Sequence, residues 1–316
     1  MDLWEEKRQE LFHQGVTVIP ILDCLTLSTF HEQFLQEVKT FPEYIDENEP
    51  RVYGSFGALG NPASFHNPTV RKLRMGMMEY ARYLFRKFPA MTSDQLWKQA
   101  NIEQLIDRMS IRRTSTQVPK ETWHRDIASN KNDNDEIFGG WINLDVDQTQ
   151  YFSCILKSHR SQDFKGESGF QRSSFESNLL QSDHRIVEVP PGSWIIFYQN
   201  IIHEVHSKRI VRDSIRLYLG FRLTDSTTPL YDMKECLLKQ GVPIGPSGQT
   251  PEMFFANHLR FHGQQVRDWS VRAFKPVCRD GDVVHRVMKS LYDYGLPMYS
   301  SYTEEEKAIL TPTRLD

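Results

Sequence analysis

Apolar residues in the first hundred positions of the chain recur at the period of an α-helix. Spacings of three and four residues place one set on a single helical face: Phe30, Phe34, Val38 and Phe41. A second set follows Asn67 and Pro68, a typical helix start, and comprises Val70, Leu73, Met77, Ala81 and Leu84. Thr92 and Gln95 form a capping-box pattern that predicts a third helix. This part of the chain is therefore expected to be mostly helical.

The pattern changes to short apolar or alternating runs from about residue 106. These runs predict strands at residues 109–118, 138–146, 151–156, 186–189, 193–198, 201–206 and 214–223. Turn signals such as Pro190-Pro191-Gly192 separate several of the runs. Earlier in the chain, a helix that ends at Gly15 is followed by one expected strand at residues 16–20. Many short strands with intervening turns favour a β-sandwich or barrel.

No linker separates independent domains, so a single domain over residues 1–316 is expected. We assign residues 1–105 to a helical N-terminal flank, 106–223 to the β-rich core and 224–316 to a C-terminal extension. The extension is irregular at first and then helical, and Thr303 and Glu306 form a capping-box pattern near its end.

Composition narrows the classes of function. Hydrophobic residues make up 39% of the chain, enough for a sizeable core, and the net charge of −3 lacks the basic surplus of nucleic-acid-binding proteins. The four cysteines form no CxxC pair. No run reaches the roughly 18 apolar residues of a membrane span, and the first residues lack the apolar core of a signal peptide. We therefore expect a soluble, cytoplasmic protein with neither nucleic-acid nor membrane partners.

Two histidines and one aspartate are the candidate metal ligands. His124 and Asp126 close the first β segment, and residues two apart on a strand point to the same side. His203 follows an apolar run that starts at Gly192, whereas the competing His206 has the opposite strand parity. Two imidazoles and one carboxylate leave open positions on a metal ion, which is the arrangement of non-haem Fe(II) oxygenases.

The expected strand after His203 carries charge on one face. Alternation places four polar or aromatic residues on one side and apolar residues on the other, the first set being Arg212, Ser214, Arg216 and Tyr218. Two inward-facing arginines would be costly unless an anion met them, and a carboxylate ligand can pair with a guanidinium through two hydrogen bonds.

In their order along the chain, these motifs resemble the Fe(II)/2-oxoglutarate-dependent dioxygenases, and within them the phytanoyl-CoA-dioxygenase-like group. The motifs that carry the resemblance are His124-x-Asp126, the run from Gly192 through Phe197 to His203-x-Val205, and Arg212-x-Ser214. Residues 12–20 are similar to the group's opening helix and strand. Residues 141–159 are similar to its core strand and following Gly-Ser-His turn, with Lys157 in place of the glycine. The resemblance covers about residues 10–223.

The resemblance implies a double-stranded β-helix core, a cupin-like jelly roll, with flanking N-terminal and C-terminal helices. It implies that His124, Asp126 and His203 hold Fe(II), with O2 and the co-substrate 2-oxoglutarate at the remaining positions. The implied reaction hydroxylates an aliphatic C–H bond and yields succinate and CO2. Asp126 favours hydroxylation over halogenation, because related halogenases have a small residue at that position.

The resemblance also implies that an arginine meets the far carboxylate of 2-oxoglutarate. Arg212 carries the Arg-x-Ser pattern and is favoured, with Arg216 on the same face as the alternative. Ser214 and Asn143 are the other candidate co-substrate contacts. The substrate, a small molecule or a protein side chain, stays open, and residues 161–183 and those after 224 are the expected covers of the site.

Two rival hypotheses use a similar fold. A non-catalytic jelly-roll protein would keep the strands for binding or for structure, but the complete set of candidate ligands counts against it. Another metal-dependent jelly-roll enzyme, such as a cupin, usually carries a His-x-His pair, and this sequence has none.

Overall fold

A computed structural model describes the parts of the chain on which the following account rests. The described residues are 2–38, 68–86, 88, 100–105, 108–112, 117–118, 121–126, 135–160, 171–172, 183–205, 208–209, 212–230 and 302–315. Several sequence predictions concern positions outside them, namely the helix from Thr92, the helical part of residues 231–301, Phe41, His206 and most of the expected cover at 161–183.

The predicted helices at Gly15, at Phe30 and Phe34, after Pro68 and at Thr303 are present in the described part, and a short 3-10 helix lies where a turn was expected. These helices are α1 (Leu3–Gln14), α2 (Cys24–Val38), α5 (Pro68–Phe85), the short 3-10 helix η2 (Ser158–Arg160) and α11 (Glu304–Ala308). Helix α1 ends at Gly15, whose φ of 88° is the left-handed conformation that favours glycine. Helix α11 has the predicted capping box, in which Thr303 and Glu306 each accept a hydrogen bond from the backbone of the other. No helix of the described part is long and apolar enough to cross a membrane.

The larger of two main sheets is antiparallel and has eight strands. Six lie in the order β1 (Val16–Pro20), β10 (Ser193–Tyr198), β6 (Glu136–Asn143), β14 (Phe221–Thr224), β2 (Asn101–Gln104) and β15 (Thr313–Arg314). The other two are β13 (Ser214–Tyr218), which pairs with β6, and β3 (Arg108–Arg112), which pairs with β13. Strands β13 and β14 keep one register against β6, so they continue each other across Leu219 and Gly220. The single run predicted at 214–223 is thereby confirmed.

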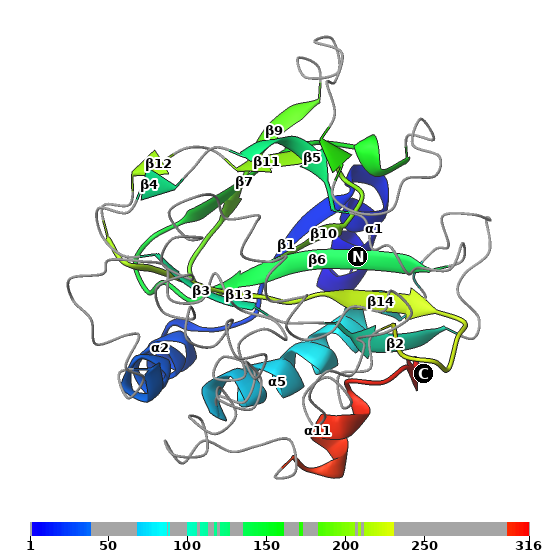
Figure 1. Cartoon of the computed structure of the whole chain (residues 1–316), viewed down its shortest axis with the longest axis horizontal. Helices are drawn as coiled ribbons and strands as arrows, with labels where there is room; N and C mark the ends of the chain where they lie inside the picture. Colours follow the sequence, from blue (N-terminus) through cyan, green and yellow to red (C-terminus); the bar gives the residue numbers. More distant parts are fainter. Residues whose placement is uncertain are drawn as a thin grey trace, which may run out of the picture.

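The second sheet has five antiparallel strands and lies over the first one (Figure 1). Its order is β8 (Gln171–Arg172), β5 (Glu121–Arg125), β11 (His203–Val205), β7 (Gln150–Ile155) and β9 (His184–Val189). A separate ribbon pairs β4 (Gln117–Val118) with β12 (Lys208–Arg209). The expectation of many short strands from about residue 106 is confirmed, and the described structure is mainly antiparallel β.

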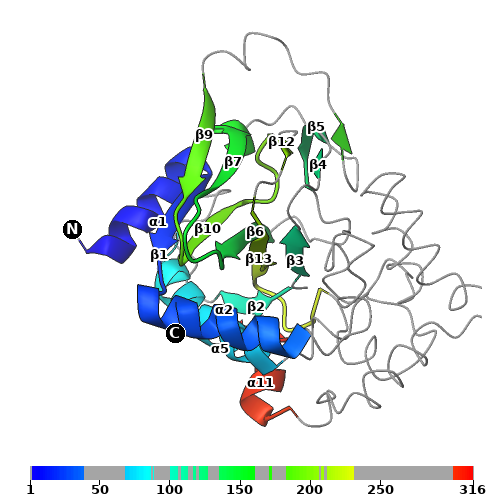
Figure 2. The same ribbon diagram turned by 90° about the vertical axis from the view of Figure 1, so that its left-hand side faces the viewer.

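Apolar cores fill both faces of the larger sheet. Between the two sheets, Phe152 of β7 stacks on Phe197 of β10, with ring centroids 4.4 Å apart. On the other face, Phe138 of β6 packs against Phe85 of α5, with ring centroids 4.5 Å apart. Figure 2 shows α2 and α5 along that second face. The larger sheet is therefore the middle layer between the helices and the smaller sheet.

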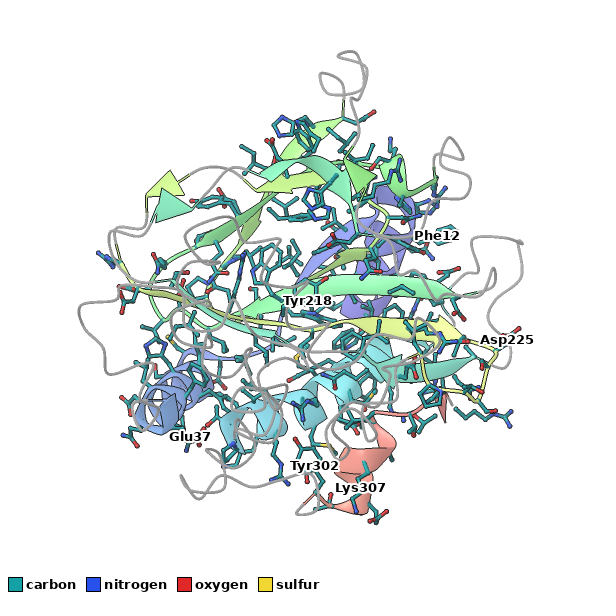
Figure 3. All side chains as sticks on the ribbon, in the orientation of Figure 1. Phe12, Glu37, Tyr218, Asp225, Tyr302 and Lys307 are labelled. Carbon is teal, nitrogen blue, oxygen red and sulfur yellow. The ribbon has the colours of Figure 1, made fainter. Side chains whose placement is uncertain are left out.

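Strands from both predicted flanks belong to the larger sheet. Strands β1 and β2 come from residues 1–105, and β15 comes from the C-terminal extension. The extension is also bound to α5, where the guanidinium of Arg71 forms an ion pair with Glu306 and lies 4.2 Å from the ring centroid of Tyr302. Tyr302 and α11 lie together at the base of the molecule in Figure 3. The core is thus assembled from segments distant in sequence.

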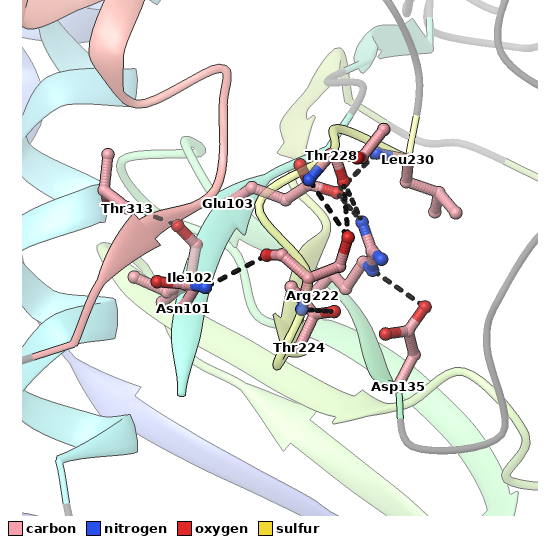
Figure 4. A network of polar contacts seen from close by, with 10 residues as sticks. Asn101, Ile102, Glu103, Asp135, Arg222, Thr224, Thr228, Leu230 and Thr313 are labelled. Carbon is pink, nitrogen blue, oxygen red and sulfur yellow. Dashed lines mark hydrogen bonds and ion pairs between the residues drawn. The ribbon is translucent and has the colours of Figure 1, made fainter. Parts of the chain in front are cut away.

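A buried ion network fastens β14 to β2 and β6 (Figure 4). The Arg222 guanidinium pairs with the carboxylates of Glu103 and Asp135 at 2.8 Å each, and the three side chains are at most 2% exposed. Burial raises the pKa of the Glu103 carboxyl, and the hydrogen bond from Arg222 opposes this shift. Arg222 also donates to the carbonyl of Thr228, while the amide of Leu230 donates to Glu103. The network therefore holds residues 225–230 against the sheet.

We predict that Arg222→Met lowers the free energy of unfolding by about 3–5 kcal/mol, because it leaves two buried carboxylates without their cation. Arg212→Met is the matched control, since Arg212 pairs with Asp147 at the surface, where both side chains are more than half exposed. Its expected cost is below about 1 kcal/mol. Urea denaturation measures both values, and equal losses would contradict the assignment.

His159 joins the end of α1 to the larger sheet. Its Nε2–H donates to the carbonyl of Phe12 at 3.1 Å, and its ring stacks on Tyr198 with centroids 4.5 Å apart. A Cβ on Gly15 would lie 2.4 Å from the His159 ring, so this approach requires glycine. Burial lowers the pKa of His159 to about 4, and the charges of Arg160 and Arg125 add to the effect.

The lowered pKa of His159 predicts an acid-sensitive fold. Because the unfolded chain binds the proton more tightly, the contribution of neutral His159 is fully present above about pH 6.5 and is lost as pH falls towards 4. One pKa unit corresponds to about 1.4 kcal/mol, so the loss is up to about 3 kcal/mol. Thermal unfolding between pH 7 and 4 should show a shallower pH dependence for His159→Gln than for the wild type. An equally steep pH dependence in the two proteins would contradict this assignment.

Candidate metal centre

The two candidate histidines come together because β5 and β11 are paired. His124 is the direct antiparallel partner of His203, and cross-strand partners present their side chains on the same face of a sheet. Their imidazole centroids lie 4.2 Å apart, with the rings inclined by 54°. Both side chains are buried, with His124 2% and His203 7% exposed. The register of one strand pair therefore creates the pair of imidazoles.

Asp126 completes the group from the position just beyond the end of β5. Its Oδ1 lies 3.6 Å from Nε2 of His124, and its Oδ2 lies 3.6 Å from Nε2 of His203. One ligand atom from each residue can be chosen so that all lie within 4.8 Å of one another. The backbone amide of Asp126 donates to the carbonyl of Gln199 at 2.9 Å, which positions the carboxylate. The structure thus brings together the three residues that the sequence predicts as metal ligands.

Hydrogen bonding and burial prepare His203 to act as a ligand. Its Nδ1–H donates to the carbonyl of Ile201 at 3.1 Å, which leaves Nε2, the nitrogen nearest Asp126, with its lone pair. Burial lowers the pKa of His203, although the charge of Asp126 acts in the opposite direction. The neutral imidazole is the form that binds metals.

The donor set fits a divalent ion with open coordination positions. Two imidazole nitrogens and one carboxylate are the protein ligands of non-haem Fe(II) sites, in which other positions stay available to small ligands. The Asp126 side chain is 30% exposed while both histidines are buried, so the group is accessible from the side of the carboxylate. The residues therefore fit Fe(II) by chemistry and by access.

Aromatic rings occupy the space between this group and the larger sheet. The centroids of Phe152 and Phe197 lie 5.3 and 5.5 Å from the His203 ring. Trp141 follows, with its centroid 5.6 Å from that of Phe152, and the Arg216 guanidinium lies 4.9 Å from the Trp141 ring centroid. Tyr218, on the same face of β13 as Arg216, is seen near the centre of the molecule in Figure 3. Arg216 is therefore on the side of the larger sheet that faces the candidate ligands.

The favoured co-substrate arginine occupies a different place. Arg212 precedes the first residue of β13, and its side chain is 61% exposed and paired with Asp147. Of the two arginines weighed in the sequence, Arg216 rather than Arg212 lies beside Trp141, which packs against Phe152 and Phe197, the rings that contact His203.

The other two predicted co-substrate contacts are engaged in a buried network around Asp145. The Asn143 side chain donates to the carbonyls of Gln148 and Val189 at 2.9 and 2.8 Å and accepts from the Asp145 amide. Ser214 donates to Asp145 Oδ2 at 3.0 Å. Burial raises the pKa of Asp145, and its hydrogen bonds oppose the shift. These contacts tie β6 to the start of β13.

Two residues that the sequence analysis left without a role belong to the frame of the site. Asp145 is one, and Arg125, between two candidate ligands on β5, is the other. Arg125 is 1% exposed and donates to the carbonyls of Ser158 and Asn200. Strand parity contained a signal for Arg125, since a residue between two inward-facing ligands must point away from them.

No family model and no curated protein match the sequence. Among solved structures, the chain is similar to the epimerase SnoN in complex with Fe3+, alpha-ketoglutarate and nogalamycin RO. The identity is 12%, the match covers 71% of this chain and 84% of SnoN, and the TM-score is 0.49.

Two further solved structures give similar values. EctD from S. alaskensis, with 2-oxoglutarate and 5-hydroxyectoine, is 11% identical over 70% of this chain and 76% of EctD, with a TM-score of 0.46. HygX from Streptomyces hygroscopicus, with nickel and 2-oxoglutarate, is 14% identical over 70% of this chain and 86% of HygX, with a TM-score of 0.43.

Proposed function

We propose that this chain is an Fe(II)- and 2-oxoglutarate-dependent dioxygenase that hydroxylates an aliphatic C–H bond. The observation that carries the proposal is the convergence of His124, Asp126 and His203 within 4.8 Å, from two paired strands. Two imidazoles and one carboxylate match the ligand preference of non-haem Fe(II). The bound iron and 2-oxoglutarate would supply O2 activation, in which one oxygen atom enters the substrate and the other enters succinate, with release of CO2.

The chain's own residues hold, orient and shield the reacting groups. His124, Asp126 and His203 bind the iron, and the Ile201 carbonyl keeps His203 in the tautomer that presents Nε2. Phe152 and Phe197 exclude water from the inner side of the centre. The exposed edge of Asp126 is the side from which substrate enters. The substrate is a small molecule or a protein side chain.

Arg216 is the residue that we assign to the far carboxylate of 2-oxoglutarate. Its guanidinium stacks on Trp141, and Trp141 packs against Phe152 and Phe197, the two rings next to His203, so Arg216 is the arginine on the side of the larger sheet that faces the candidate ligands. A guanidinium binds a carboxylate through two hydrogen bonds, and packing on an aromatic ring limits its orientations. We assign Asn143 and Ser214 an indirect role. Both form hydrogen bonds with Asp145 and so hold the start of β13, the strand that carries Arg216.

The proposal also includes a fold type and a family for this chain. We infer that the two facing antiparallel sheets form a double-stranded β-helix, and that the chain is one domain, since strands β1, β2 and β15 from both flanks belong to its larger sheet. The order of the motifs along the sequence supports the phytanoyl-CoA-dioxygenase-like group.

The decisive experiment is 2-oxoglutarate turnover, followed as succinate release in the presence of Fe(II) and a library of candidate substrates. Asp126→Ala and His203→Ala are expected to reduce turnover at least about 100-fold, because each removes a metal ligand. His184→Asn is the matched control, since His184 lies in the same sheet and contacts Ser153 instead of the candidate ligands. It should retain turnover.

Two results would contradict the proposal. Full turnover in both ligand variants would show that the triad does not carry the reaction. Calorimetry that detects neither Fe(II) nor 2-oxoglutarate binding to the wild type would favour a non-catalytic binding or structural protein.

We predict that Arg216→Met raises the KM for 2-oxoglutarate by about 10- to 100-fold, which corresponds to about 1.4–2.7 kcal/mol of lost binding to a charged group. Arg212→Met provides the comparison, because its guanidinium is paired with Asp147 at the surface. That variant should change the KM by less than about two-fold. The opposite ranking of the two variants would return the role to Arg212.

A further inference from the structure

Arg125 occupies an unusual position for a charged residue. It lies on β5 between the two candidate ligands His124 and Asp126, and its side chain is 1% exposed. Burial of a guanidinium is costly unless its N–H groups are hydrogen-bonded. Here Arg125 donates hydrogen bonds to the backbone carbonyls of Ser158 and Asn200. The sequence therefore places a buried cation where it connects backbone segments.

The segments joined by Arg125 are those that shape the metal centre. Asn200 belongs to the turn between β10 and β11, and this turn leads directly into His203. The amide of Asp126 donates to the carbonyl of Gln199 in the same turn, at 2.9 Å. Arg125 and Asp126 thus bind adjacent residues of one turn from one strand end. The two contacts set the distance between β5, which carries His124, and the turn that directly precedes His203.

The third segment, around η2, forms hydrogen bonds with residues of the same turn. Ser158 accepts the Arg125 hydrogen bond with its carbonyl at 2.9 Å, and its Oγ accepts from the amide of Ile202 at 2.8 Å. The Asn200 side chain donates to the carbonyl of His159 at 3.0 Å. Arg125 is therefore the side chain that bonds to both the turn before His203 and the segment that holds this turn.

We propose that Arg125 is a positioning residue, which keeps the His124–Asp126 half and the His203 half of the metal centre at ligand-binding distance. The inference rests on the proposed function insofar as the centre binds a metal ion. The hydrogen bonds that Arg125 donates to Ser158 and Asn200 end on backbone carbonyls, so its effect passes through the backbone of Gln199 to Ile202. Ligand geometry of this kind governs metal affinity.

The first test is Mn(II) affinity of the full chain, measured by the electron paramagnetic resonance signal of free Mn(II). Arg125→Met should weaken the Mn(II) Kd by about 10- to 100-fold, the usual effect of losing a group that orients metal ligands. Arg125→Lys, which keeps the charge and one donor group, should recover part of this loss. If Mn(II) binds both variants within about two-fold of the wild type, the proposal is wrong.

The control separates positioning from general stability. Arg74 on α5 is also buried, at 2% exposed, and donates to the Tyr302 hydroxyl on the helical side of the larger sheet. Arg74→Met should lower the melting temperature and leave the Mn(II) Kd unchanged. An equal loss of Mn(II) affinity in Arg74→Met and Arg125→Met would assign Arg125 a merely structural role.

A metal-free measurement keeps the two proposals distinguishable. Hydrogen exchange of the apo chain should become faster at the amides of Asp126 and Ile202 in Arg125→Met, and stay unchanged in β1 and β10. Failure of the wild type to bind Mn(II) or Fe(II) would end the proposed function, while the exchange experiment would still decide the role of Arg125. Unchanged exchange at both amides would overturn it.

Discussion

The antiparallel pairing of β5 with β11 is the constraint on which the site depends. It makes His124 and His203 direct partners. In the turn before β11, the carbonyl of Gln199 accepts a hydrogen bond from the amide of Asp126. A slip of one residue in this pairing would turn His203 to the opposite face of the sheet. The register is irregular immediately after His203, between it and Val205, so the strand is held at the histidine from the preceding turn. Stacking of Phe152 on Phe197 then holds the sheet that carries these ligands against the larger sheet.

Arginine shows how surroundings decide the role of one residue type. Arg222 is buried between two carboxylates and connects strands. Arg212 forms an exposed pair that water and salt screen. Arg216 stacks on Trp141 on the inner face of the larger sheet, and we propose that it binds a carboxylate there. Arg125 meets carbonyl oxygens, so its contribution is to geometry. The amino-acid composition does not distinguish these four arginines, which differ in burial and in the groups that they contact.

Two polar networks frame the candidate centre at opposite ends of the smaller sheet. At one end, Arg125 joins β5 to η2 and to the turn before His203. At the other, Asp145 accepts hydrogen bonds from the Ile215 amide and from Gln150 and Ser214, which ties the larger sheet to the first residue of β7. Both networks are buried and directional, whereas apolar contacts alone permit small shifts between sheets. The aromatic rings provide the packing energy, and the two networks set the alignment.

Local pattern in the sequence determined the helices α2 and α5, most strands of the two sheets and the three candidate ligands, because periodicity and strand parity are properties of neighbouring residues. It did not indicate β2 or β15, since Asn101–Gln104 has no clear alternation and Thr313–Arg314 is too short; they are strands because they pair with a sheet edge. Parity also could not rank Arg212 against Arg216, which share a face in an ideal strand. Only the tertiary structure separates their positions, because β13 begins at Ser214, after Arg212. The role of Arg125 likewise depends on carbonyls distant in sequence, which folding alone brings within reach.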